Sequence, residues 1–236
     1  MNELETFIQQ CASELRTESQ ASAVARHYLL ADRGLTESTI ADHSIGYCTT
    51  TQATPGNSSV VKGRIVVPIY EEFGDLVGLA ARSPNPNESG WWNTSFEKNN
   101  HIFLFNRSRE AVFKNDKIYI FEGYMDGLVL FQQGLKNVGA LMGTSLGYRR
   151  IGLLKRYCNR VCLVFDADVN QAGQRAHDRS VYELTRFSFN EISHIALPIG
   201  VDPDEFVLKH GLQAFLDLEK SMSREDKEES IKRFSQ

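Results

Sequence analysis

The sequence predicts an α/β fold in which a mainly parallel sheet carries helices on its faces. Short apolar runs with the length and composition of buried strands recur in the second half of the chain, at 118–121, 138–142, 161–165 and 192–197. The segments between them are predicted helices, at 124–133, 148–157 and 173–187. Because strands that alternate with helices of this size pair in parallel, these elements should form one sheet covered on both sides.

The first half of the chain predicts a smaller mixed subdomain. Two short helices are expected at 22–34 and 36–43, followed by a strand pair at 63–70 and 76–83. Pro68 lacks an amide hydrogen, so its strand should be an edge strand or carry a bulge. After residue 198 helices are expected, and the charged residues from Ser223 onward predict a solvated helix or a disordered tail. The expected domains are an N-terminal mixed α/β subdomain (1–115), the main α/β domain (116–198) and a C-terminal helical segment (199–236).

The composition is that of an ordinary globular protein, with 42% apolar and 24% charged residues. No stretch approaches the length of a membrane span and the N-terminus lacks an apolar signal core, so a cytoplasmic protein without membrane contact is expected. The cysteines show no CxxC pair or disulfide-like spacing and are expected to be buried thiols. The net charge of −4 does not itself indicate nucleic-acid binding, and the basic run at 148–160 is typical of a solvated helix face.

Acidic residues stand at the ends of three predicted elements. Glu122 ends the strand at 118–121, and the other acids that follow in the same way are Asp126, Asp166, Asp168, Asp202 and Asp204. Neighbouring parallel strands lie about 4.8 Å apart and would bring such residues to one edge of the sheet. Because clustered carboxylates repel one another and hard cations remove that repulsion, the pattern predicts a Mg²⁺ or Mn²⁺ site suited to phosphoryl transfer.

Local structural roles could also account for these acids. Glu122 could cap the next helix, although its repulsion from Asp126 one turn later favours a functional role. Residues 166 and 168 occupy positions where loop or N-cap aspartates are common. The sequence DPDE at 202–205 has the composition of a helix start, with Asp202 as N-cap and Glu205 closing a capping box. The GTS at 143–145 could be a plain turn or could offer backbone amides to a phosphate.

The order of these motifs resembles one known family. EGYMD at 122–126, GTS at 143–145, FDAD at 165–168 with AGQRA after it, and DPDEF at 202–206 resemble the Toprim domain of bacterial DnaG-type primases. Upstream, YLLADRGLTESTIADHSIGY resembles the helical opening of that family's RNA polymerase domain, and GRIVVPIYEEFGDLVGLAARS resembles its basic hairpin. WWNTSFEKNNHIFLFN resembles its NTP-binding segment. The resemblance covers about residues 22 to 215, and the ordered set is specific where Glu-Gly or DxD alone is not.

The resemblance implies a Toprim-type sheet and assigns roles to individual residues. Glu122 would be the Toprim glutamate, acting near the metals in proton transfer, with Asp166 and Asp168 as catalytic metal ligands. A site for two or more Mg²⁺ or Mn²⁺ ions would be completed by Asp126, Asp202 and Asp204. Residues implied to bind substrate are Arg64 and Arg82, facing NTP phosphates or template, and Asn93 in the nucleotide-binding segment.

The chain departs from the family pattern at four points. It has no Cys or His set for the family's N-terminal zinc ribbon, and it ends soon after DPDEF, where family members continue into a helicase-binding domain. GWWNTS stands where the family pattern places a lysine before Tyr-Leu-Asn-Ser, and FDADVNQAG is two residues longer than the usual FDGDxAG. A separate zinc-ribbon protein and a replicative helicase are therefore expected partners, as in the split primases of phages and mobile elements.

The implied function is that of a DNA-dependent RNA primase catalytic core, which uses metal-dependent nucleotidyl transfer to make short RNA primers from NTPs on single-stranded DNA for replication. A Toprim-type nuclease is an alternative, in which the same metals cleave a phosphodiester, although the upstream hairpin argues against it. Another alternative is a non-catalytic accessory protein, which predicts tight binding of single-stranded nucleic acid that is indifferent to divalent metal.

Overall fold

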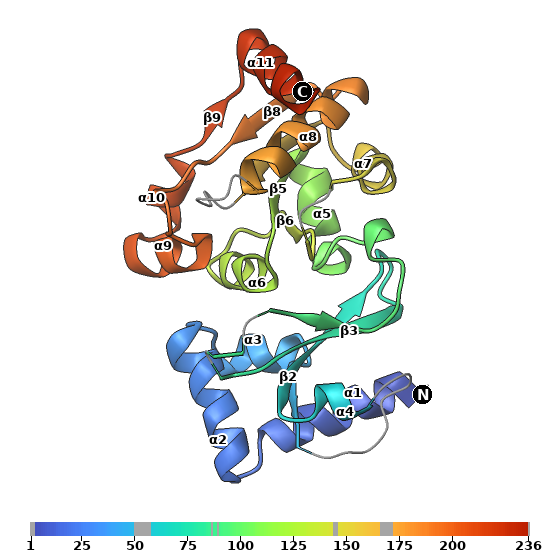
Figure 1. Ribbon diagram of the computed structural model, residues 1–236, viewed down its shortest axis with the longest axis vertical. Helices are drawn as coiled ribbons and strands as arrows, with labels where there is room; N and C mark the ends of the chain where they lie inside the picture. The colour runs from blue at the N-terminus through green and yellow to red at the C-terminus, as the bar shows by residue number, and fades with distance from the viewer. Residues whose placement is uncertain are drawn as a thin grey trace. The chain divides into compact units, whose positions relative to one another are not determined.

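The computed structural model describes residues 3–49, 58–85, 87–88, 90–143, 146–165 and 172–235. The chain divides into two compact units, Met1–Phe96 and Glu97–Gln236 (Figure 1). Each unit is built on a sheet of its own.

The first unit contains an antiparallel sheet with the strand order β1-β2-β3-β4. Its strands are β1 (Gly46–Cys48), β2 (Arg64–Tyr70), β3 (Leu76–Arg82) and β4 (Trp92–Asn93). Its helices are α1 (Glu3–Leu15), α2 (Gln20–His27), the π-helical turn η1 (Tyr28–Asp32), α3 (Glu37–Asp42) and α4 (Ser58–Val61). The predicted hairpin and both predicted helices are therefore confirmed.

Pro68 lies where β2 has a neighbouring strand on one side only. β1 pairs with β2 no further than Val66, and a bulge follows between Ile69 and Tyr70. Leu79, which opposes Pro68, directs its own amide and carbonyl to Thr94 on the far side. The missing amide hydrogen of Pro68 therefore breaks no ladder bond, and the predicted edge-like position with a bulge is confirmed.

Helix α1 covers one face of this sheet. Its buried residues Phe7, Ile8 and Cys11 pack with the strand residues Cys48, Val66, Leu79 and Ala81. β1 approaches α1 so closely that a Cβ added to Gly46 would lie 2.4 Å from the carbonyl carbon of Cys11 and 2.5 Å from the nitrogen of Ala12. The N-terminal segment is therefore a docked helix.

Gly46→Ala is expected to displace α1 and to lower the stability of the first unit by about 2 kcal/mol, because the added methyl meets helix backbone, which cannot move aside as a side chain can. Gly152→Ala is the matched control, since its methyl would meet no atom within 4 Å and alanine is the better helix former. Urea unfolding measures both. A Gly46→Ala variant as stable as the wild type would contradict the close packing of α1.

The second unit contains a five-stranded sheet with the order β6-β5-β7-β8-β9, in which only the β8–β9 pairing is antiparallel. Its strands are β5 (Lys117–Phe121), β6 (Val138–Ala140), β7 (Arg160–Val164), β8 (Glu191–His194) and β9 (Lys220–Ser221). Its helices are the 3-10 turn η2 (Lys98–Asn100), α5 (Phe105–Asn115), α6 (Tyr124–Gln132), α7 (Tyr148–Lys155), α8 (Ala172–Arg186), α9 (Pro203–His210), α10 (Leu212–Leu216) and α11 (Arg224–Phe234). The predicted α/β fold with a mainly parallel sheet is confirmed.

Apolar residues of the parallel strands form the core of the second unit. Ile118, Ile120, Val161, Leu163 and Ile192 pack together with buried residues of α5, α7 and α8. Helix α5 contacts β5 and β6, so residues 105–115 pack on the sheet that the sequence analysis assigned to the following domain. The domain limits at 115 and 198 themselves stay a prediction.

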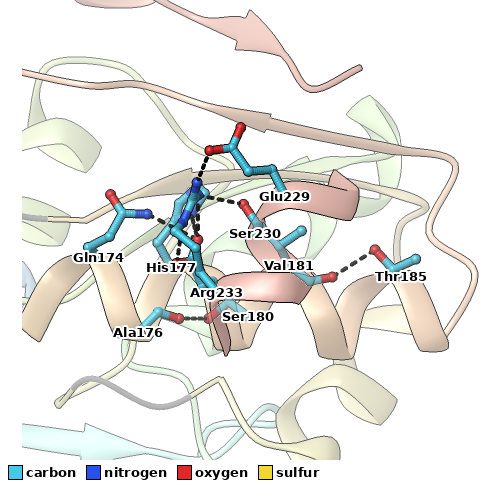
Figure 2. A network of polar contacts seen from close by, with 10 residues as sticks. Gln174, Ala176, His177, Ser180, Val181, Thr185, Glu229, Ser230 and Arg233 are labelled. Carbon is cyan, nitrogen blue, oxygen red and sulfur yellow. Dashed lines mark hydrogen bonds and ion pairs between the residues drawn. The ribbon is translucent and has the colours of Figure 1, made fainter. Parts of the chain in front are cut away.

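The charged C-terminal segment is an ordered helix, α11, which packs along α8 (Figure 2). Ser223 and Asp226 close a capping box at its start. Just before β9, the carboxylate of Glu219 accepts hydrogen bonds from Lys117 Nζ (2.5 and 2.6 Å), from the Tyr119 hydroxyl (2.9 Å) and from Ser193 Oγ. These bonds fasten the chain between α10 and β9 to the sheet.

All four cysteines are free and buried, as predicted. None of the described helices combines the length and the apolarity that crossing a membrane requires.

Candidate functional site

The parallel register brings the ends of three strands to one edge of the sheet in the second unit. Phe121 at the end of β5 is aligned with Ala140 in β6 and with Val164 in β7. Glu122 follows β5 directly and is half-buried. Asp166 and Asp168 follow β7 in the sequence but lie outside the described residues. Ligands of parallel α/β sheets bind beyond this carboxyl edge.

Asp126 and Asp204 meet between two helices that pack side by side, α6 and α9 (Figure 1). Asp126 is 8% exposed and Asp204 is 2% exposed. The backbone N–H of Asp204 donates to Asp126 Oδ1 at 3.4 Å, although 78 residues separate them in the chain. The structure therefore brings together two of the predicted metal ligands in a buried position.

Asp202 lies at the N-cap position of α9 with Pro203 after it, as predicted, but the predicted capping box is not formed. Among the described residues its side chain caps no amide of the helix, and it is exposed. Asp204 Oδ1 instead accepts from the Glu205 N–H at 2.9 Å. The carboxylate of the buried Asp204 thus accepts from a backbone amide in the first turn of α9, and the Asp202 carboxylate stays at the surface.

Gly123 leaves room for the carboxylate of Asp126. A Cβ added to Gly123 would lie 2.5 Å from Asp126 Oδ2, so any side chain at this position would displace that oxygen. The Asp126 carboxylate therefore bends back toward the start of α6, where the helix dipole favours a negative charge. Sequence reasoning assigned Gly123 no such role. The available signal was a glycine between a strand and a helix whose first turn contains an aspartate.

The donor set at this edge has the chemistry of a site for a hard cation. Within the described ranges, no three His, Cys, Asp or Glu residues are arranged to hold a metal ion. Two of the six predicted ligands, Asp166 and Asp168, lie outside those ranges. Asp126 and Asp204, which meet through the Asp204 amide, carry carboxylate oxygens, the ligand type that Mg²⁺ and Mn²⁺ prefer to soft ligands.

The predicted substrate-binding residues lie in the first unit, on two faces of its sheet. Ile65 opposes Arg82 and Ala80 opposes Asn93, so alternation places Arg82 and Asn93 on one face. Arg64 precedes Ile65 and therefore belongs to the other face, where its guanidinium lies 3.7 Å from the Glu88 carboxylate. The register brings Arg82 and Asn93 to a common face and separates Arg64 from them.

The Arg82 guanidinium lies near two aromatic rings. Its guanidinium carbon is 5.7 Å from the ring centroid of Trp91 and 6.0 Å from that of Tyr28. Its Nε is buried and has no hydrogen-bond partner in the described part of the chain. Tyr28 begins the π-helical turn η1, a feature frequent at functional sites, and its hydroxyl accepts from Arg33 Nε at 2.9 Å. Because a buried donor without an acceptor is costly, this cluster is a candidate ligand site around the predicted Arg82, and sequence reasoning did not assign Tyr28 to it.

The basic run at 148–160 is not a simple solvated face. Arg150 is 2% exposed and donates to three backbone carbonyls. Lys155 Nζ donates to the Ser188 carbonyl at 2.8 Å and Arg160 Nη2 to that of Asn115 at 2.6 Å. The prediction of a solvated face is therefore wrong for Arg150.

Part of the chain matches a known domain family, and the chain is similar in sequence to bacterial DNA primases. Residues 119–207 match the family of Toprim-like domains. DNA primases from Clostridium acetobutylicum and Enterococcus faecalis are 36% identical over 163 residues and 33% identical over 165 residues. Each similarity covers 66% of this chain and 26% of the relative. The chain thus spans about a quarter of the length of the curated relatives it matches.

Solved structures of DnaG have the same fold. A structure of the DnaG catalytic core has a TM-score of 0.77 and 24% identity, covering 91% of this chain and 77% of that one. The DnaG primase catalytic domain bound to single-stranded DNA has a TM-score of 0.77 and 23% identity, covering 91% of this chain and 78% of that one. The chain therefore contains a Toprim-like domain, has the fold of the DnaG catalytic core and is related in sequence to bacterial DNA primases.

Proposed function

We propose that this chain is the catalytic core of a DNA-dependent RNA primase. One observation carries the proposal: the likeness extends well beyond the Toprim-like domain. The sequence similarity covers 66% of the chain, which is more than the second unit holds, and the likeness of fold covers 91%. A Toprim-type nuclease needs only the part around the parallel sheet. The additional likeness in the first unit therefore favours primer synthesis.

The proposed reaction joins a primer 3′-hydroxyl to the α-phosphorus of an NTP and releases pyrophosphate. Two or more Mg²⁺ or Mn²⁺ ions, when bound, supply Lewis-acid chemistry for this step. The residues proposed to hold them are Glu122, Asp126, Asp166, Asp168, Asp202 and Asp204. Glu122 is also proposed to accept the proton of the attacking hydroxyl. The buried contact between Asp126 and Asp204 supports this assignment.

Arg82 is proposed to bind the NTP triphosphate, and Asn93, on the same face, to bind the nucleotide. The support is the buried Nε of Arg82, which an anionic oxygen would satisfy. Arg64 is proposed to contact the phosphates of a single-stranded DNA template, because it stands at the start of β2 and its side chain is 24% exposed. The template proposal is supported by the relative whose structure was solved with single-stranded DNA. A zinc-ribbon protein and a replicative helicase are proposed partners.

The test is RNA synthesis by the purified chain with NTPs and Mg²⁺ or Mn²⁺ on two substrates. Single-stranded DNA tests initiation, alone and with a candidate zinc-ribbon or helicase partner. The same DNA carrying an annealed RNA primer tests elongation without requiring a partner. Template-dependent incorporation that EDTA abolishes is the expected result. Nicking without NTPs would establish a nuclease instead. Tight DNA binding unaffected by EDTA, without incorporation, would identify a non-catalytic binding protein.

A further inference from the structure

Arg150 is a buried cation in the second unit that joins two distant segments of the chain. Its side chain extends from α7 to these segments. Nε donates to the His101 carbonyl at 2.8 Å, and Nη2 donates to the carbonyls of Lys98 (2.7 Å) and Leu141 (2.6 Å). Burial lowers the pKa of Arg150 to about 10, so the side chain stays charged at neutral pH. A buried charge is tolerated only when it is well hydrogen-bonded, so these three contacts constrain both segments.

One path leads from Arg150 to the acid-bearing turn at 122–126 through the peptide groups of Leu141. The Leu141 carbonyl accepts from Arg150, and the Leu141 N–H donates to the Phe121 carbonyl at 2.9 Å. Phe121 directly precedes Glu122. Met142, next to Leu141, is 5% exposed and has a φ of 58°, a conformation that persists only where the surroundings hold it. Arg150 therefore holds Leu141, the residue that follows β6, and Leu141 is in turn hydrogen-bonded to the last residue of β5.

A second path leads through Tyr124, the first residue of α6. Tyr124 is 2% exposed. Its ring meets that of Phe103 edge-on, with centroids 5.0 Å apart. Phe103 in turn exchanges two hydrogen bonds with Ala140, at 2.9 and 3.1 Å. The segment that Arg150 holds at residues 98 and 101 thus also supports the start of α6.

We propose that Arg150 is a positioning residue that fixes the turn at 122–126, and with it Glu122 and Asp126, without touching substrate. Its effect on catalysis rests on the proposed function, whereas its effect on the turn does not. Arg149 provides the matched comparison, because it contacts the same segment from the surface. Arg149 is 55% exposed at its side chain and lies 3.2 Å from Asn100 Oδ1 and 3.6 Å from the Glu97 carboxylate.

The test compares Arg150→Lys, Arg150→Met and Arg149→Met by hydrogen exchange and by binding of Mn²⁺ alone. In both Arg150 variants the amides of residues 119–128 should exchange about tenfold faster, and Mn²⁺ affinity should fall about 10- to 100-fold, the range for residues that orient metal ligands. β7 and β8 should keep wild-type protection. Arg149→Met should match the wild type in both measurements. The lysine variant keeps a buried cation, so the test can still be made if the methionine variant fails to fold.

Either of two exchange patterns would overturn the proposal, as would unchanged exchange. Faster exchange confined to residues 98–103 would make Arg150 a local clamp, and an equal loss of protection throughout the second unit would make it only a core residue. Because neither measurement requires primer synthesis, an inactive chain with faster exchange at 119–128 would refute the proposed function and leave this proposal standing. Full primer synthesis with unchanged exchange in Arg150→Lys would support the proposed function and refute the positioning role of Arg150.

Discussion

Asp126→Asn is expected to reduce metal-dependent primer synthesis about 1000-fold, and Gly123→Ala should reproduce most of that loss without removing an ionisable group. The physical reason is the distance of 2.5 Å between Asp126 Oδ2 and a Cβ built on Gly123. A methyl group there would force the carboxylate away from the start of α6. The Gly123→Ala variant would then contain every predicted ligand but hold one of them in the wrong place.

Gly127→Ala is the control for this pair of variants. It adds the same methyl one turn later in α6, where the nearest atom is the flexible Leu104 Cδ1 at 3.2 Å. Elongation of an annealed RNA primer measures activity, and Mn²⁺ binding measures the site directly. Gly127→Ala should retain both. Wild-type synthesis by Gly123→Ala would mean that the position of the Asp126 carboxylate does not matter to the reaction.

The predictable part of the fold is the part decided by local chemistry. The parallel strands β5, β6 and β7 are short and largely apolar because both faces of their sheet are covered, and that pattern is visible in the sequence. The edge-like position of Pro68 in β2 is predictable because it follows from one residue: proline has no amide hydrogen to donate to a second neighbouring strand. The fold class and the carboxyl edge follow from such features.

The arrangement within the candidate site depends on contacts between distant residues, which no local pattern encodes. In the DPDE segment, capping rules favour Asp202 as the cap. The structure exposes Asp202 and buries Asp204 against Asp126, because α9 packs beside α6. Arg150 stands in a run of cations, and only the carbonyls of Lys98, His101 and Leu141 distinguish it from exposed Arg149. Sequence resemblance predicts a role for the acids but does not encode the contacts that position them.

Arg233→Met is expected to destabilise the second unit by about 3 kcal/mol, because it breaks the ion pair that docks α11 on α8. Arg233 Nε and Nη2 donate to the two carboxylate oxygens of Asp178, each at 2.9 Å, and Arg233 also binds Glu229 and Ser230 (Figure 2). The Asp178 side chain is only 5% exposed. Without Arg233 its charge would remain buried, with Gln174 Nε2 still donating to it at 3.0 Å.

The matched control for Arg233 is Arg224→Met in the same helix. Arg224 pairs with Glu228 at 2.7 Å, but both side chains are largely exposed, so its loss should cost less than about 1 kcal/mol. Urea unfolding gives the stability difference, and hydrogen exchange in α8 and α11 locates it. Equal effects of the two substitutions would show that the contact with Asp178 contributes no more than a surface pair.

The Arg233 effect should also depend on pH in a defined direction. Burial by itself would raise the pKa of Asp178, but the hydrogen bonds from Arg233, Ser230 and Gln174 outweigh it and lower that pKa. A carboxyl group whose pKa is lowered by folding stabilises the fold above its unfolded value of about 3.9 and loses that contribution as the pH falls through the folded value. The wild type and Arg233→Met should therefore differ most near neutral pH and approach one another below about pH 4. A difference that stays constant across this range would assign the loss to packing of the Arg233 stem instead of its charge.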